Sequence, residues 1–139
     1  GYNNAFRYSP QQTHSVGLGG NISKSLYSMK IGEKPAPEYE ATTNDAGNGS
    51  IMRLAPVAIA YHTAPLAEAR SAAAASSRTT HPGPIASEAC AFLSHLIIRA
   101  LNDGFTKGPG AARAFLIKAA DEYIEDEICE GGTRCRAVR

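Results

Sequence analysis

The chain has 139 residues, a formal net charge of +1 at pH 7, and a composition of 43% hydrophobic and 19% charged residues. This length suits one domain with a buried core, and this balance excludes a disordered chain. Lysine and arginine do not cluster, so no nucleic-acid partner is predicted. No apolar run approaches the ~20 residues of a membrane-spanning helix, so no membrane partner is predicted either.

The N-terminal stretch and the cysteines bear on the cellular compartment. GYNNAFRYSP has neither the basic nor the apolar region of a signal peptide. Cys90 lies in an apolar helical pattern, which is typical of a small buried side chain. Cys129 and Cys135 could form a disulfide, whereas a zinc site would need more Cys or His at closer spacing. We expect reduced thiols in an intracellular, cytoplasmic protein.

The first third of the chain is predicted to be rich in loops. Residues 2–20 show no helical period, and residues 31–49 combine prolines with polar side chains. Between them, apolar residues on one face predict a short helix over 21–30.

Two helices are predicted in the middle of the chain. The first covers 51–61, with the Ser50 hydroxyl as its N-cap, and Pro56 should cause a kink or a 3₁₀ start. The second is an alanine-rich helix that begins near Pro65, with Thr63 as its N-cap, and continues to about residue 77.

The last two helices carry the clearest apolar pattern. One runs from Pro84 to Asp103, and Gly104 stands where a left-handed residue ends a helix. The other spans 109–129. Because no comparable β-alternation is present, we predict an all-α fold that forms one domain over residues 1–139.

A glycine-rich turn, Gly47 to Ser50, stands directly before the helix predicted over 51–61. Glycine permits positive φ and lets a ligand approach the backbone closely. Successive N–H groups in such a turn, with the positive end of the following helix, can bind an anion, and Asn48 and Ser50 add side-chain hydrogen bonds. Such turns are also common without a ligand, so a phosphate-binding loop and a plain connector both remain open.

Two further polar residues lie near helix ends. His81, in SSRTTHPGP, precedes the 84–103 helix, whose dipole favours a neutral imidazole donor; the alternative is a loop histidine bonded to a neighbouring carbonyl. Arg53 either braces the loop, reaches an anion, or forms a salt bridge. His95 lies among apolar neighbours within a helix and is interpreted as structural.

Two segments together carry a family resemblance. AGNGSIMRLAPVAIAY and SSRTTHPGPIASEAC resemble the ADP-ribosylglycohydrolase family, the group that includes hydrolases acting on ADP-ribosylated dinitrogen reductase. In that family a Gly-Asn-Gly-x-x-Met-Arg segment is followed, at a similar separation, by a Thr-His segment that opens a helix. The earlier SVGLGGNISKSL resembles a third family segment. The resemblance covers about residues 16–103.

The resemblance implies a fold, an activity and a set of ligand-facing residues. The fold would be a compact, multi-helix orthogonal bundle. The activity would be cleavage of the glycosidic bond between ADP-ribose and a protein side chain or related acceptor, with a pair of magnesium ions. The partner would be ADP-ribose or an ADP-ribosylated protein. Carried over by position, the substrate-binding residues are Gly47, Asn48, Gly49, Ser50, Met52, Arg53, Thr80 and His81.

The carboxylate motifs that hold magnesium in this family are missing from this chain. Family members carry a Thr-Asp-Asp-Thr-like segment early and an Asp-x-Asp-Thr segment late. The four aspartates here are neither adjacent nor spaced in that way, and they are Asp45, Asp103, Asp121 and Asp126. Because magnesium needs such oxygen ligands, we assign no metal ligand and no catalytic residue to this chain. The acidic run DEYIEDEICE is interpreted as a solvated helix face.

Two explanations account for these departures. The start at Gly1 and the charged tail EGGTRCRAVR favour a central, incomplete piece of a longer magnesium-dependent hydrolase. The other explanation is a degenerate member that keeps part of the ligand cradle without the chemistry. We therefore expect a hydrolase, with two alternatives: a non-catalytic ADP-ribose or nucleotide-binding protein, and a purely structural helical fragment.

Overall fold

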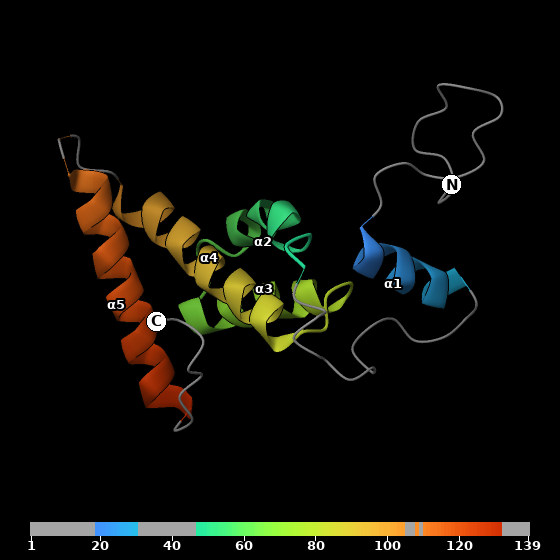
Figure 1. Cartoon of the computed structure of the whole chain (residues 1–139). Helices are drawn as coiled ribbons and strands as arrows, with labels where there is room; N and C mark the ends of the chain where they lie inside the picture. The colour runs from blue at the N-terminus through green and yellow to red at the C-terminus, as the bar shows by residue number, and fades with distance from the viewer. Residues whose placement is uncertain (1–18, 31–46, 105–107, 109, 132–139) are drawn as a thin grey trace.

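The computed structural model describes residues 19–30, 47–104, 108 and 110–131 (Figure 1). The predicted loops over 2–18 and 31–46, and the side chains of Cys129 and Cys135, lie outside the described part. Within it the chain forms helices and no strand, so the all-α prediction is confirmed. The elements are α1 (Gly20–Lys30), the 3₁₀ helix η3 (Ile51–Arg53), α2 (Ala55–Ala60), α3 (Leu66–Arg78), α4 (Pro84–Asp103) and α5 (Ala111–Gly131).

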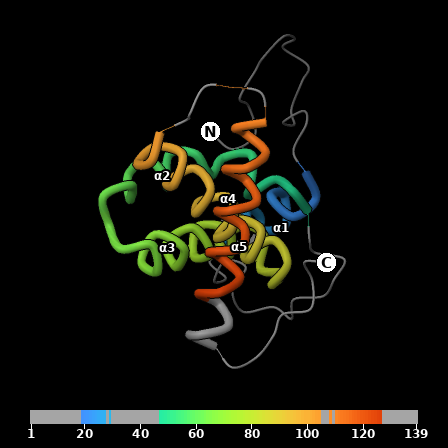
Figure 2. The backbone as a smooth tube through the Cα atoms, turned by 90° about the vertical axis from the view of Figure 1, so that its left-hand side faces the viewer, coloured from blue at the N-terminus to red at the C-terminus, as the bar shows by residue number. Residues whose placement is uncertain are grey.

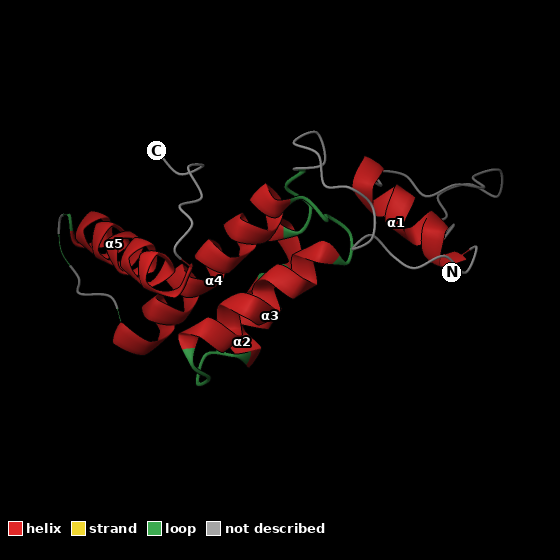
Figure 3. Ribbon diagram, turned by 90° about the horizontal axis from the view of Figure 1, so that it is seen from below, coloured by secondary structure: helices red, strands yellow, loops and turns green. Residues whose placement is uncertain are grey.

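Helix α4 is the centre of the bundle. It contacts η3, α2, α3 and α5, and its most extensive interface is with α3, which runs beside it (Figure 3). Figure 2 is viewed from the side on which α5 lies and shows α5 crossing α4. Small side chains on both helices let α3 and α4 approach closely, because Ala73 on α3 and Cys90 on α4 are fully buried against each other and Leu54.

The length and composition of α4 also meet the minimum for a membrane-spanning helix, which the sequence analysis had not anticipated. Its mean hydropathy is 1.3 over an 18-residue window. However, α4 is covered by other helices and buries residues along its length, among them Ala86, His95 and Ile98. The central helix of a soluble bundle has the same properties, so this observation does not imply a membrane partner.

Most helix boundaries follow the sequence prediction. Pro84 opens α4, and Gly104 follows its end with a positive φ of 69°, although its ψ of 165° is extended rather than left-handed helical. The 3₁₀ start predicted from Pro56 is present as η3, and α2 then begins at Ala55 with the proline in its first turn. The predicted Thr63 cap is wrong, because Pro65 is the N-cap of α3 and makes no side-chain cap bond.

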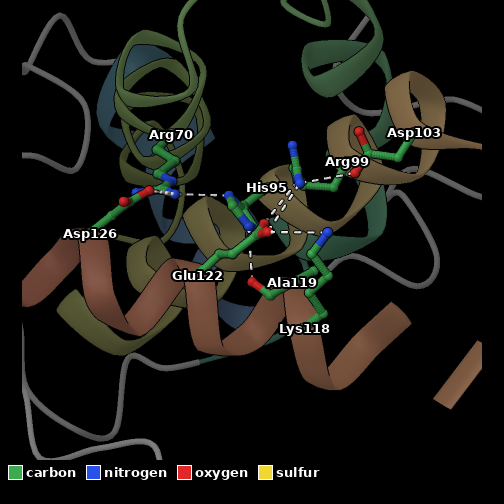
Figure 4. Close-up of polar contacts among 8 residues, drawn as sticks. All are labelled: Arg70, His95, Arg99, Asp103, Lys118, Ala119, Glu122 and Asp126. Atoms are coloured by element: carbon green, nitrogen blue, oxygen red, sulfur yellow. Dashed lines mark hydrogen bonds and ion pairs between the residues drawn. The ribbon is translucent and has the colours of Figure 1, made fainter. Parts of the chain in front are cut away.

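Polar contacts attach α5 to α3 and α4 (Figure 4). The imidazole of His95 is fully buried, and its Nε2 lies 2.9 Å from the carbonyl oxygen of Ala119 on α5. Because Nε2–H donates there, Nδ1 is the acceptor for Nη2 of Arg70 at 2.8 Å. Arg70 also pairs with Asp126 at 2.7 Å and lies 4.6 Å from the ring centroid of Tyr123. The structural role predicted for His95 is therefore confirmed.

The acidic run on α5 is only partly a solvated face. Asp121 and Glu125 are exposed, as predicted. Glu122, in contrast, forms ion pairs with Arg99 and with Lys118, and Asp126 forms the pair with Arg70. The sequence interpretation missed the pairs with Arg70 and Arg99 because these arginines belong to other helices.

Candidate ligand-binding loop

The glycine-rich turn lies directly on the imidazole of His81. A Cβ atom built on Gly49 would lie 2.9 Å from Cε1 and 3.0 Å from Nε2 of His81, closer than real side chains approach. A Cβ on Gly47 would lie 3.4 Å from the same ring, which is ordinary contact. The two polar segments identified in the sequence, 47–50 and 76–84, therefore meet in space.

The reason for glycine at position 49 differs from the one predicted. Gly49 is not among the residues with positive φ, so its backbone needs no special conformation. It needs space, because the imidazole occupies the position where a methyl group would be. This space requirement comes from a neighbour inside the protein, whereas the sequence analysis attributed it to a ligand.

Ser50 is buried and does not cap the following helix. Its φ of −71° and ψ of −35° are helical, and its hydroxyl makes no cap bond, so the predicted N-cap is wrong. Instead the hydroxyl oxygen lies 2.8 Å from the hydroxyl oxygen of Ser77 on α3 and 3.5 Å from the thiol of Cys90 on α4. The side chain therefore anchors the turn to the interior of the bundle.

His81 is held from both sides and is buried, with 3% of its surface exposed. Its backbone N–H donates to the Ser77 carbonyl at 2.8 Å, and its Nδ1 lies 2.8 Å from Oγ1 of Thr80. Burial, and next the positive charge of Arg53, lower the pKa of His81 below its ordinary value. The neutral imidazole that the sequence predicted is therefore favoured, and the causes that favour it are burial and the charge of Arg53.

Arg53 braces the loop, which was one of the roles predicted for it. Its Nη2 donates to the carbonyl oxygen of Ser76 at 2.7 Å and to Oγ1 of Thr79 at 2.9 Å. Thr79 Oγ1 in turn lies 2.8 Å from the Ser76 carbonyl oxygen. The guanidinium thus binds the last turn of α3, where carbonyl groups lack helical partners. None of its partners among the described residues is a carboxylate, so the described contacts support the bracing role and show no salt bridge.

Helix α1 adds residues that the sequence analysis did not single out. The Ser25 hydroxyl donates to the Thr79 carbonyl at 2.6 Å. Nδ2 of Asn21 would lie 3.6 Å from a Cβ on Gly47, and Cδ1 of Ile22 would lie 3.5 Å from one on Gly49. The only sequence signal for this contact was the resemblance of residues 15–26 to a family segment, because α1 and the loop are far apart in the chain.

The predicted ligand-binding residues divide into an exposed and a buried group. Gly47, Asn48, Met52 and Arg53 are exposed, with Met52 at 82%, and Gly49 is half-buried. Two half-buried residues beside this edge, Gly49 and Ile51, have backbone N–H groups that donate to no backbone carbonyl within the described residues. The buried members support this edge from below, and they are Ser50, Thr80 and His81.

The sequence model of one family, described as ADP-ribosylglycohydrolase, matches residues 2–139. The chain belongs to the ADP-ribosylglycohydrolase family. Membership confirms the resemblance drawn from the glycine turn and the Thr-His segment, and it agrees with the helical fold. A search of curated proteins and a search of solved structures each returned no match.

The described residues do not fit the magnesium ions that the family resemblance implies. Among them, no three His, Cys, Asp or Glu side chains lie close enough together to hold a metal ion. The described hydrogen bonds of the loop and of His81 involve hydroxyl, carbonyl, thiol and imidazole groups rather than carboxylates. Since magnesium prefers carboxylate oxygens, we assign no chemical step to a metal here.

Proposed function

We propose that this member of the ADP-ribosylglycohydrolase family contributes to the cleavage of ADP-ribose from a protein side chain or related acceptor, and that its glycine turn binds the ADP-ribose. One observation carries this proposal: the Gly49 turn is seated on a buried imidazole and leaves its outer edge exposed. A fixed edge of backbone N–H groups suits a diphosphate, because the donors need not be ordered again on binding.

Each group of residues then has a defined task. Asn48 and the backbone N–H groups of the half-buried residues Gly49 and Ile51 would donate to phosphate oxygens, and exposed Met52 would offer an apolar contact next to them. His81 would act from beneath the turn rather than by direct contact, because 3% exposure leaves its ring no free face. This assignment revises the substrate-binding role that the family resemblance implied for His81.

A second function, binding of ADP-ribose without hydrolysis, is favoured by a separate observation. The described hydrogen bonds of the turn and of His81 involve no carboxylate, and the described residues hold no cluster of three His, Cys, Asp or Glu side chains. Magnesium dependence therefore stays a prediction for ligands outside the described residues.

Two measurements test the proposal. Isothermal titration of ADP-ribose into the full chain should give saturable heat, and a silent titration of well-folded protein would leave only a structural role. Release of ADP-ribose from an ADP-ribosylated protein, with and without magnesium, then separates the two binding functions. Release that depends on magnesium supports the hydrolase, and binding without release supports the non-catalytic protein.

A further inference from the structure

Ser77, near the end of α3, joins the two halves of the candidate site. Its side chain is 1% exposed, and its hydroxyl oxygen lies 2.8 Å from that of Ser50, in the glycine turn. Its carbonyl oxygen accepts the backbone N–H of His81 at 2.8 Å and that of Thr80 at 3.1 Å. The same residue thus contacts the turn through its side chain and the imidazole segment through its backbone.

These contacts hold the glycine turn and the His81 segment in fixed positions relative to each other. The His81 carbonyl oxygen also lies 3.4 Å from the Ser77 hydroxyl, so His81 is held at both its N–H and its C=O. Ser50 has a second buried partner in the thiol of Cys90, but at 3.5 Å that contact is longer and a thiol is a weaker donor. The hydrogen bond between Ser77 and Ser50 is therefore stronger than the Cys90 contact and contributes more to holding the turn on the bundle.

We infer that Ser77 is a positioning residue of the ligand-binding loop, which acts through Ser50 and His81 and does not touch the ligand. Burial removes it from any contact with solvent, and its neighbour Ser76 offers its carbonyl rather than its hydroxyl to Arg53. Only the expected change in ADP-ribose binding rests on the proposed function. The geometry of the turn can be measured without a ligand.

Substitution of Ser77 by alanine tests the inference. Ser77→Ala should shift the amide resonances of Gly49 and the ring resonances of His81, and should weaken ADP-ribose binding about tenfold. Ser76→Ala is the matched control, since it removes a neighbouring hydroxyl from the same helix without changing the Ser50 contact. Ala75→Gly, at an exposed position of α3, controls for a general loss of helix stability.

A double-mutant cycle with Ser50→Ala isolates the action through Ser50. If Ser77 acts through Ser50, the two substitutions should not be additive. The double variant should lose less binding free energy for ADP-ribose than the sum of the losses in the two single variants. Ser77→Cys serves if the alanine variant does not fold, because it keeps a side chain of similar shape with a weaker donor. The Ser77→Cys variant should shift the same resonances, but by smaller amounts.

The outcomes separate this inference from the proposed function. Binding by Ser77→Ala within about twofold of Ser76→Ala, with unshifted Gly49 and His81 resonances, would overturn the positioning role. No binding by the wild-type chain would overturn the proposed function instead. In that case the resonances of Gly49 and His81 would still support or refute the role of Ser77.

Discussion

Gly49 and His81 are in such close contact that the imidazole fills the space of a side chain at position 49. The missing methyl group would lie 2.9 Å from Cε1 of the ring. The ring cannot easily withdraw, because it is buried and its backbone is tied to Ser77. The glycine and the histidine are therefore one structural unit, although 32 positions separate them in the sequence.

Gly49→Ala should destabilise the fold, whereas Gly47→Ala should not. The first places a methyl group within 3.0 Å of two imidazole atoms, and overpacking of this kind costs about 1–3 kcal/mol. The second places it at 3.4 Å, which the loop can accept. Urea unfolding followed by circular dichroism measures both, and equal free energies of unfolding for the two variants would contradict the contact.

Arg53→Ala should raise the pKa of His81, because the charge of Arg53 is one of the two causes that hold it low. The pKa should still remain below its ordinary value, since burial is the larger cause. Loss of the bonds to Ser76 and Thr79 should also reduce stability by about 1 kcal/mol.

The titration of the His81 ring protons by NMR measures the pKa. Arg53→Lys keeps the positive charge and is the matched control. A pKa of His81 that is the same in the alanine and lysine variants would show that the charge of Arg53 does not act on the ring.

Stability should decline as the pH falls below about 6.5, the ordinary pKa of histidine that His95 regains on unfolding. Burial and the charge of Arg70 are the two largest causes that lower the pKa of His95 in the folded chain, and Arg99 adds to them, while the Ala119 carbonyl and Glu122 act in the opposite direction. The unfolded chain therefore binds more protons, and the loss reaches at most about 1.4 kcal/mol per pH unit for this one proton until the folded pKa is passed.

Urea unfolding over a pH series measures this dependence. His81 contributes with the same sign, because its pKa is also lowered. His95→Gln removes the titrating group from the α5 contact and keeps an N–H donor for Ala119, so its stability should vary less with pH. An unchanged slope in that variant would show that His95 does not cause the dependence.

Arg70→Ala should be strongly destabilising, by about 3 kcal/mol. The side chain is 7% exposed, and its removal leaves a cavity and takes the partner from Nδ1 of His95. Arg78→Ala is the matched control, because that exposed arginine contacts only the carbonyl of Ala74 in its own helix, at 3.5 Å, among the described bonds. Its unfolding free energy should change by less than about 0.5 kcal/mol. Similar losses in both variants would refute the importance of the α5 contacts.

The helices were predictable because their signals are local. An apolar stripe, an opening proline and a closing glycine defined α4, and the proline at position 56 correctly indicated the 3₁₀ start. The family resemblance placed the glycine turn and the Thr-His segment in one set of ligand-facing residues, and the structure brings the two segments into contact. The local sequence pattern alone gave no indication of this contact.

The errors concern groups whose partners are distant in the chain. Ser50 was predicted to cap its own helix, but its hydroxyl binds Ser77, 27 residues away, and a buried partner is preferred to a cap position open to water. Arg70 lies in an alanine-rich helix and carries no local signal of burial. Its surroundings are set by α5, where Asp126 and Tyr123 lie.

The most direct test of the account is the affinity for ADP-ribose of Gly49→Ala, measured by titration calorimetry under conditions where the protein is folded. Gly20→Ala is the control, because a Cβ there meets nothing within 4 Å. We predict that the wild-type chain and Gly20→Ala bind equally, and that Gly49→Ala binds at least about tenfold more weakly because the turn is displaced from His81. Equal affinity of folded Gly49→Ala and wild type would contradict the claim that this turn forms the binding site.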